Sequence, residues 1–216
     1  MAPVPPQRKS NILVTGYGAF KSAPVLNPSW EAVKTLEGLQ SNGYRIVPRL
    51  MTVAYEFVSA NLPPLIAEFE PAAIIHVGQG LPNTINLETI AHPQGYVHPD
   101  VENQMAPEGT VILPPPADGS PFPSPLRTIL DNEALRDAMR AKGWDICNVS
   151  TDAGRYLCEY IFYSSLYLTR ESPVPVLFLH IPAPGAPYSQ EQLDIAVRDL
   201  VSLVAATLEA GALSGA

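Results

Sequence analysis

Short runs rich in apolar and β-branched residues recur along the chain, and each of them predicts a strand. Several lack an alternation of apolar and polar positions, which indicates that both faces of the strand are covered. The candidates are residues 11–15, 45–53, 72–80, 145–151 and 175–182. Pro48 cannot donate a hydrogen bond to a neighbouring strand, so we expect it to interrupt the second of these runs.

Segments with helical periodicity separate these strands. In residues 27–39 the large apolar side chains share one side, and Asn27 or Ser29 can cap the first turn. A break is expected in the next helical segment at two consecutive prolines, Pro63 and Pro64. The other helical candidates are 54–70, 126–142, the segment around Cys158, and 189–209.

The alternation of strands and helices predicts an α/β fold with a mainly parallel sheet that is covered on both faces. A chain of 216 residues suits one such domain. We expect the domain to span residues 11–210, with a flexible segment at 1–10 and a frayed tail at 211–216. In sheets of this kind, functional side chains collect where strands end and loops begin.

Residues 92–125 differ from the rest because they are dense in proline, glycine, aspartate and asparagine. We expect two long loops here, on either side of a short strand at 109–113. Loops of this length often form lids or pocket walls. For the proline-rich part at 114–125, a lid, an assembly surface and a tolerated loop are all left open.

The chain carries 13 basic and 21 acidic residues, which give a formal net charge of −8. This charge argues against binding to nucleic acid or to an anionic membrane surface. The first ten residues lack the apolar segment of a secretory signal, and no apolar run is long enough to span a bilayer. A cytoplasmic location is therefore expected.

The two cysteines, Cys147 and Cys158, are too few for a disulfide scaffold, and we expect both to be reduced. Cys158 is either a buried small apolar residue or a nucleophile. A helix that begins near Arg155 would place it in the first turn, where backbone N–H groups favour a thiolate. A start at Asp152 would weaken this effect.

His180 and Glu88 are candidate partners for Cys158. His180 ends an apolar strand, where it can act as a base or serve as a hydrogen-bonded structural residue. Glu88 lies in an otherwise apolar stretch, so it needs a partner if it is buried, and the alternative is that it faces solvent. A thiol, an imidazole and a carboxylate would form a thiol-hydrolase triad, which the spacing allows without establishing it.

The remaining candidates are less specific. His76 lies in the middle of a strand and is expected in the core, whereas His92 and His98 are expected to be solvated. Because the four histidines are scattered, no metal site is expected. The chain has no glycine-rich phosphate-binding motif, so a nucleotide site is unsupported. Tyr17 and Phe20 follow the first strand and could cap the core or form the walls of a flat pocket.

Four blocks of the chain resemble, in order, the landmark motifs of the pyroglutamyl peptidase I family of cysteine peptidases. They are ILVTGYGAF…NPSWEAVKTL, IIHVGQG…INLETIA, DAGRYLCEYIFY and FLHIP. The resemblance covers about residues 11–205, and its most specific parts are NPSWEAV and AGxYxCxxxFY. It implies a single three-layer α/β/α domain without a cofactor, and removal of an N-terminal pyroglutamyl residue from peptides through an acyl-enzyme.

The resemblance also implies catalytic roles. Cys158 matches the family's nucleophile, His180 its general base, and Glu88 the acid that orients the histidine. If Glu88 points away from His180, Asp152 is the next candidate for the orienting acid.

Three further residues match positions that bind the substrate. Tyr17 and Phe20 match two aromatic residues that sandwich the pyroglutamyl ring, and Gln79 matches a glutamine whose backbone helps to hold the lactam. An apolar slot with backbone hydrogen bonds can accept an uncharged lactam, while an ordinary charged N-terminus would lose its hydration there.

The chain departs from the family pattern in the pocket loops. Lys21 and Ser22 replace two glycines, Thr89 replaces a basic residue after the acid, and Val97 replaces an arginine. Two alternatives to pyroglutamyl cleavage therefore stay open: binding of a peptide or small acid without cleavage, and hydrolysis of another amide or lactam. A homo-oligomer is also left open.

Overall fold

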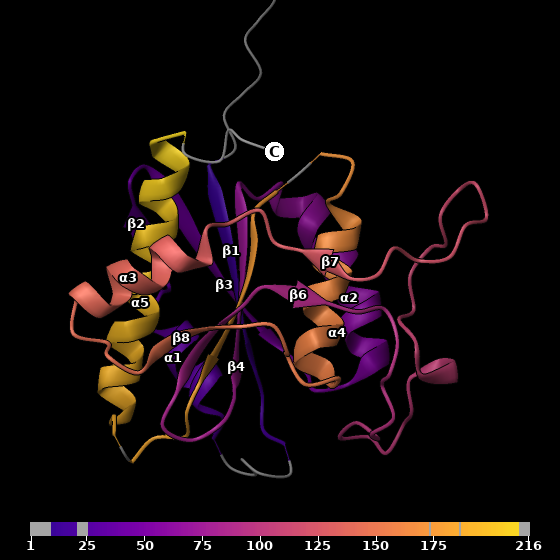
Figure 1. Ribbon diagram of the computed structural model, residues 1–216, viewed down its shortest axis with the longest axis horizontal. Helices are drawn as coiled ribbons and strands as arrows, with labels where there is room; N and C mark the ends of the chain where they lie inside the picture. Colours follow the sequence, from indigo (N-terminus) through magenta and orange to yellow (C-terminus); the bar gives the residue numbers. More distant parts are fainter. Residues whose placement is uncertain (1–9, 21–25, 173, 186, 212–216) are drawn as a thin grey trace, which may run out of the picture.

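The computed structural model of the protein describes residues 10–20, 26–172, 174–185 and 187–211 (Figure 1). The expectations for the N-terminal segment before residue 10, for the tail after 211, and for Lys21 and Ser22 lie outside these residues. Within the described part of the chain, no helix is long and apolar enough to cross a membrane.

A seven-stranded sheet forms the centre of the molecule, in the order β2-β3-β1-β4-β9-β5-β8. Most neighbouring strands are parallel, and only the pairs β2–β3 and β5–β9 are antiparallel. The strands are β1 (Asn11–Tyr17), β2 (Gln40–Ser41), β3 (Tyr44–Met51), β4 (Ala73–Gln79), β5 (Ile85–Glu88), β8 (Cys147–Ser150) and β9 (Val176–Ile181). A small separate sheet pairs β6 (Ile90–Ala91) with β7 (Leu126–Arg127).

Helices cover both faces of the seven-stranded sheet, so the expected three-layer α/β/α arrangement is confirmed. One face carries α1 (Pro28–Lys34), α3 (Asn132–Ala141) and α5 (Gln190–Glu209). The other face carries α2 (Tyr55–Phe69) and α4 (Leu157–Leu168). In Figure 1, α3 and α5 lie to the left of the sheet, and α2 and α4 lie to the right.

The central strands are mostly apolar because they have two cores to fill. In β1, Ile12 and Val14 pack with α1 and α5 on one face, while Leu13 packs with α2 and α4 on the other. In β9, Leu177 and Leu179 belong to the first core, and Phe178 belongs to the second. Successive side chains point to opposite faces of a strand, so the lack of polar positions follows directly from the two helical layers.

Pro48 does not interrupt its strand, so that expectation was wrong. It lies within β3 and pairs with Val14 of β1 in the parallel register. On the other side of β3, β2 reaches only Tyr44 and Arg45, so the strand forms the sheet edge at Pro48. A proline is tolerated at an edge because its missing N–H leaves no neighbouring strand unpaired.

The two prolines in α2 do not break that helix either. α2 is continuous from Tyr55 to Phe69 and contains Pro63 and Pro64 in its interior. Prolines there remove backbone hydrogen bonds and disfavour the helix. The buried side chains on both sides of the pair, Leu62 before it and Phe69 after it, hold the helix against the core despite this loss.

The middle of the chain has less regular structure than expected. Residues 109–113 form no strand, only an isolated bridge between Gln94 and Thr110 next to a short 3₁₀ helix at Pro107–Gly109. The expected helix at 126–142 begins only at Asn132, because β7 occupies its first residues and Asp131 supplies the cap.

The proline-rich loop at 114–125 packs on the C-terminal half of α4 rather than beside Cys158. Tyr167 donates its hydroxyl to the carbonyl of Pro114, Tyr163 donates to that of Pro123, and the Phe122 ring lies against both tyrosines. This segment therefore covers the outer side of α4.

His76 is packed in the core, as expected, and links three elements. Its Nδ1 lies 2.7 Å from Thr15 Oγ1 in β1, and its Nε2 lies 2.8 Å from Ser165 Oγ in α4. Burial lowers the pKa of His76 to about 3, so the ring is neutral at physiological pH. The imidazole thus fixes α4 against β1 and β4 without adding a buried charge.

Ser165→Ala should destabilise the protein by about 1–3 kcal/mol, because it leaves Nε2 of His76 buried without a partner. Urea unfolding monitored by circular dichroism measures the change. Ser172→Ala, at an exposed position after α4, is the matched control and should stay within about 0.5 kcal/mol of wild type. Equal losses in the two variants would contradict this role for the His76–Ser165 contact.

Candidate active site

The helix that carries Cys158 begins at Leu157, two residues later than the later of the two expected starts. Gly154 and Arg155 before it have φ angles of 90° and 46°, and Tyr156 is the N-cap residue. Cys158 therefore lies in the first turn, where backbone N–H groups have no acceptor within the helix. Tyr156 makes no side-chain capping hydrogen bond, so these N–H groups are available to a bound group.

His180 and Glu88 come from neighbouring antiparallel strands and contact each other. His180 lies near the end of β9, and Glu88 is the last residue of β5. His180 Nδ1 is 2.8 Å from Glu88 Oε1, and both side chains are buried. The alternative in which Glu88 faces solvent is therefore wrong, and Asp152, whose side chain is 81% exposed, is not needed as a substitute acid.

Cys158 lies close enough to His180 for its sulfur to raise the pKa of the ring, so the structure brings the thiol, the imidazole and the carboxylate together. Two glycines make room for this contact at the end of β4. A Cβ atom at Gly78 would lie 3.0 Å from Cys158 Sγ, and one at Gly80 would lie 2.6 Å from His180 Cβ. A side chain at Gly78 would press on the Phe178 ring and on the sulfur, and one at Gly80 would displace the imidazole of His180.

The charge of His180 is set by its two partners. Burial disfavours the charged ring, but the Cys158 sulfur and the Glu88 carboxylate favour it more strongly and raise the pKa of His180 from 6.5 to about 10. The folded-state pKa is thus above that of the unfolded chain. The stability that these contacts contribute is full below about pH 6.5 and is lost as the pH rises toward 10.

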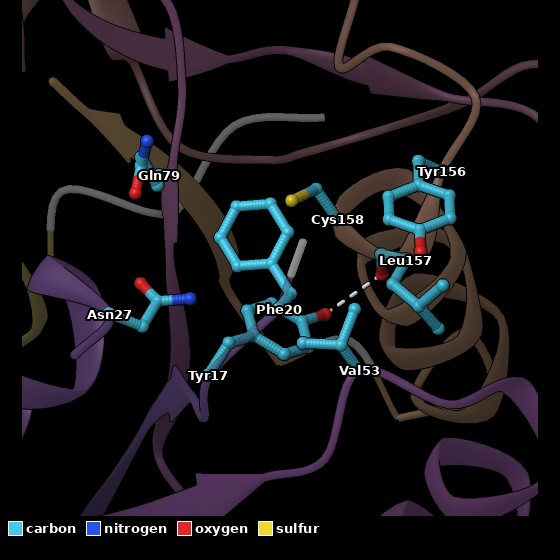
Figure 2. A pocket seen from close by; sticks show the side chains of 8 residues that line it. All are labelled: Tyr17, Phe20, Asn27, Val53, Gln79, Tyr156, Leu157 and Cys158. Carbon is cyan, nitrogen blue, oxygen red and sulfur yellow. Dashed lines mark hydrogen bonds between the residues drawn. The ribbon is translucent and has the colours of Figure 1, made fainter. Parts of the chain in front are cut away.

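A small pocket opens beside Cys158, and it contains all three expected substrate-binding residues (Figure 2). The sulfur of Cys158 points toward the ring of Phe20 in this view. The lining residues are Tyr17, Phe20, Asn27, Val53, Gln79, Tyr156, Leu157 and Cys158. Most of this surface is aromatic or aliphatic, so the pocket suits a small, flat and uncharged group.

Tyr17 connects the pocket to the start of α4. Its hydroxyl donates a 2.8 Å hydrogen bond to the carbonyl of Leu157 (Figure 2), and its side chain is buried. Burial, followed by the negative charge of the nearby Cys158, raises the pKa of Tyr17 well above its ordinary value. The phenol therefore stays protonated and donates its hydrogen bond to Leu157, the residue that precedes Cys158.

Sequence reasoning missed four of the lining residues as parts of a pocket: Asn27, Val53, Tyr156 and Leu157. Asn27 was expected only as a helix cap, which it is, because its Oδ1 accepts from the backbone N–H of Ser29. Its Nδ2 also donates to the carbonyl of Gly18, which fixes the loop after β1. Its position in the NPSWEAV block, one of the most specific motifs of the chain, could have indicated that it lies at the site.

Other candidates lie outside the pocket lining. His98 is exposed as expected, but His92 is not fully solvated, because it pairs with the buried carboxylate of Glu159 at 2.8 Å. Val97 is 64% exposed, and Thr89 donates its hydroxyl to the carbonyl of Ser150.

A thiol at the start of a helix, beside an imidazole that is hydrogen-bonded to a carboxylate and next to an apolar pocket, defines the class of thiol hydrolases. The family model described as pyroglutamyl peptidase matches residues 10–192, and the chain belongs to this family of cysteine peptidases.

Individual relatives agree with this assignment over nearly the whole chain. The chain is 32% identical to pyroglutamyl-peptidase 1 of rat and of human, with 94% of this chain and 93% of each relative covered. The crystal structure of pyroglutamyl peptidase I from Bacillus amyloliquefaciens is similar with a TM-score of 0.80, at 26% identity, and covers 92% of this chain and 98% of that one.

Removing the sulfur should lower the pKa of His180 well below 10. Burial of the ring lowers this pKa, and without the sulfur only Glu88 remains to raise it. Cys158→Ser is expected to have a larger effect than Glu88→Gln, since Cys158 is the larger of the two raising causes. NMR titration of the histidine ring signals measures the shift. Glu31→Gln, which removes a surface carboxylate paired with Lys34, is the control. A pKa that stays near 10 in Cys158→Ser would rule out the sulfur as the partner of His180.

Proposed function

We propose that this protein is a cysteine peptidase that removes the N-terminal pyroglutamyl residue from peptides. The observation that carries the proposal is the place of Cys158 beside the hydrogen-bonded pair of His180 and Glu88, next to the pocket that contains Tyr17 and Phe20. The names of the relatives, pyroglutamyl-peptidase 1 and pyroglutamyl peptidase I, support the choice of substrate.

The first half of the reaction forms an acyl-enzyme. The Cys158 thiolate attacks the carbonyl carbon between the pyroglutamyl residue and the rest of the peptide. Negative charge develops on the carbonyl oxygen, and the free backbone N–H groups in the first turn of α4 are the proposed donors to it. His180, protonated through its raised pKa, gives its proton to the leaving amine, and the shortened peptide departs.

The second half releases the pyroglutamate. His180, now neutral, accepts a proton from a water molecule as that water attacks the thioester. The carbon–sulfur bond breaks, the proton returns to the Cys158–His180 pair, and free pyroglutamic acid leaves. Both halves need the His180 ring to face the sulfur, and the hydrogen bond from its Nδ1 to Glu88 Oε1 holds it in that orientation.

The pocket accounts for selectivity in this proposal. Tyr17 and Phe20 provide apolar surface for the two faces of the pyroglutamyl ring, and the backbone of Gln79 is the proposed partner of the lactam. None of the residues that line the pocket in the described part of the chain is acidic, so a charged N-terminal ammonium would lose its hydration there without a counter-charge.

The alternative of binding without cleavage is not favoured. A binding module needs no ordered thiol, imidazole and carboxylate, whereas here the imidazole is hydrogen-bonded to the buried carboxylate and the half-buried thiol lies beside it. Both cysteines are unpaired, which supports a reducing compartment such as the cytoplasm. Assembly into a homo-oligomer stays a prediction.

Cys158→Ala should lower kcat for a pyroglutamyl-coumarin amide by at least about 1,000-fold, because it removes the nucleophile. Release of the fluorophore measures the rate. Cys147→Ala is the matched control and should keep most of the activity, since Cys147 is buried in β8 and its pKa is raised to about 11 by burial. The proposal fails if reduced wild-type protein gives no turnover and its Cys158 reacts with iodoacetamide no faster than a denatured control.

A substrate pair tests the class of ring that the pocket accepts. The prolyl amide has a five-membered ring of the same size as the pyroglutamyl amide, but this ring carries a charged amine and no lactam carbonyl. We expect its kcat/KM to be lower by about 10⁴-fold, because the pocket offers no counter-charge. Comparable values for the two amides would favour a hydrolase of other amides over a pyroglutamyl peptidase.

A further inference from the structure

The proposed mechanism gives no function to the buried carboxylate of Glu159. Glu159 follows Cys158 directly in the chain, and its side chain is fully buried in α4. A buried carboxylate disfavours folding unless charges and hydrogen bonds compensate it, and an apolar residue could fill the same space. Its contacts therefore indicate what it does.

Glu159 accepts hydrogen bonds from two residues, and every partner is a donor. Oε2 accepts from the backbone N–H of Arg155 at 2.9 Å, and Arg155 Nη1 lies 2.6 Å from both carboxylate oxygens. Oε1 accepts from the backbone N–H of His92 at 2.9 Å and lies 2.8 Å from His92 Nδ1. The carboxylate thus joins the turn before α4 to the segment that follows β6.

The bond to Arg155 acts on the turn that leads into Cys158. Glu159 is the third residue of α4 and reaches back to the backbone just before the helix, much as the acid of a capping box does. Arg155 has a φ of 46°, which residues other than glycine rarely adopt. The two contacts from Glu159 to the backbone and side chain of Arg155 compensate this unfavourable conformation.

The bonds to His92 attach this turn to a segment that is anchored in the core through Tyr96. Tyr96 donates its hydroxyl to the carbonyl of His92, and its ring lies edge-on against Tyr55 and Tyr160 in the buried aromatic cluster. A Cβ atom at Gly95 would lie 3.1 Å from Cδ of Arg155, so the arginine stem also packs on this segment. The start of α4 is therefore held from outside the helix.

We propose that Glu159 is a positioning residue for Cys158: by holding Arg155 and His92 together, it fixes the first turn of α4 and hence the sulfur opposite His180. The proposal rests on the proposed function for its effect on turnover. Phe20 and the backbone of Tyr17 belong to a different segment, and only the Tyr17 hydroxyl, among the described atoms of these two residues, bonds to the start of α4. Loss of Glu159 therefore acts mainly on the approach of the sulfur to the carbonyl, and less on binding of the ring.

Glu159→Gln is the main test. An amide must present its NH₂ group to a donor here, because all the partners of the carboxylate are donors. We expect kcat for the pyroglutamyl amide and the rate of Cys158 alkylation by iodoacetamide to fall about tenfold or more, with KM changed less than about threefold. Glu159→Asp keeps the charge with a shorter reach and should lie between wild type and Glu159→Gln.

The matched control is Glu171→Gln, which removes a carboxylate that is 84% exposed and lies just beyond the other end of α4. It should leave kcat and the alkylation rate at wild-type values. Thermal unfolding of each variant separates loss of fold from loss of position, because both rates are measured far below the unfolding midpoint.

The outcomes are distinguishable. A folded Glu159→Gln protein with wild-type kcat and alkylation rate overturns the proposal, as does an equal loss in Glu171→Gln. If Glu159→Gln does not fold, wild-type rates in Glu159→Asp would show that the residue serves stability alone. If wild-type protein does not cleave the pyroglutamyl amide, the proposed function fails, while the alkylation rates still decide the role of Glu159.

Discussion

The position of the Cys158 sulfur depends on the packing of α4 between the sheet and the outer loop. Ten of the twelve residues of this helix are buried, so it cannot shift without opening a core on either side. Polar contacts then define its position along and around its axis. Ser165 bonds to His76 in the sheet, the carbonyl of Leu157 accepts from Tyr17, and Glu159 holds the turn in front. A loop would not fix the position of a reactive side chain as closely.

The apolar pattern of the chain predicted the central strands and the last helix well. Their residues fill two cores, and this burial produces a pattern that few other structures would give. It failed where tertiary packing overrides a local rule. Pro48 lies in a strand because that strand is an edge, and Pro63 and Pro64 lie in a helix because its flanks are buried. Neither the edge nor the burial is visible in the local sequence, since each depends on segments far away in the chain.

The candidate site was predictable in its residues but not in its geometry. Cys158, His180 and Glu88 could be chosen from residue type and from the motifs around them. Their contact depends on where α4 begins and on the antiparallel pairing of β5 with β9, which no spacing in the sequence specifies. Glu159 was missed because a glutamate in a helix usually faces solvent, and the donors that compensate its burial come from Arg155 and from His92, 67 residues away.

The register between β5 and β9 determines the pair of Glu88 and His180. Asn86 is opposite His180, and Glu88 is opposite Phe178, so both side chains depend on the alignment of two strands rather than on the shape of a loop. A shift of one residue would turn Glu88 to the other face of the sheet. This dependence explains how the pocket loops can vary in sequence while the acid and the imidazole stay in contact.

Gly78 and Gly80 place a limit on how the protein can change over evolutionary time. Space for the sulfur and the imidazole exists only because neither position carries a Cβ atom. Every amino acid other than glycine adds at least that atom, so no single substitution at either position is a small step. A homologue with a side chain at either position would therefore need other changes in the site to make room for it.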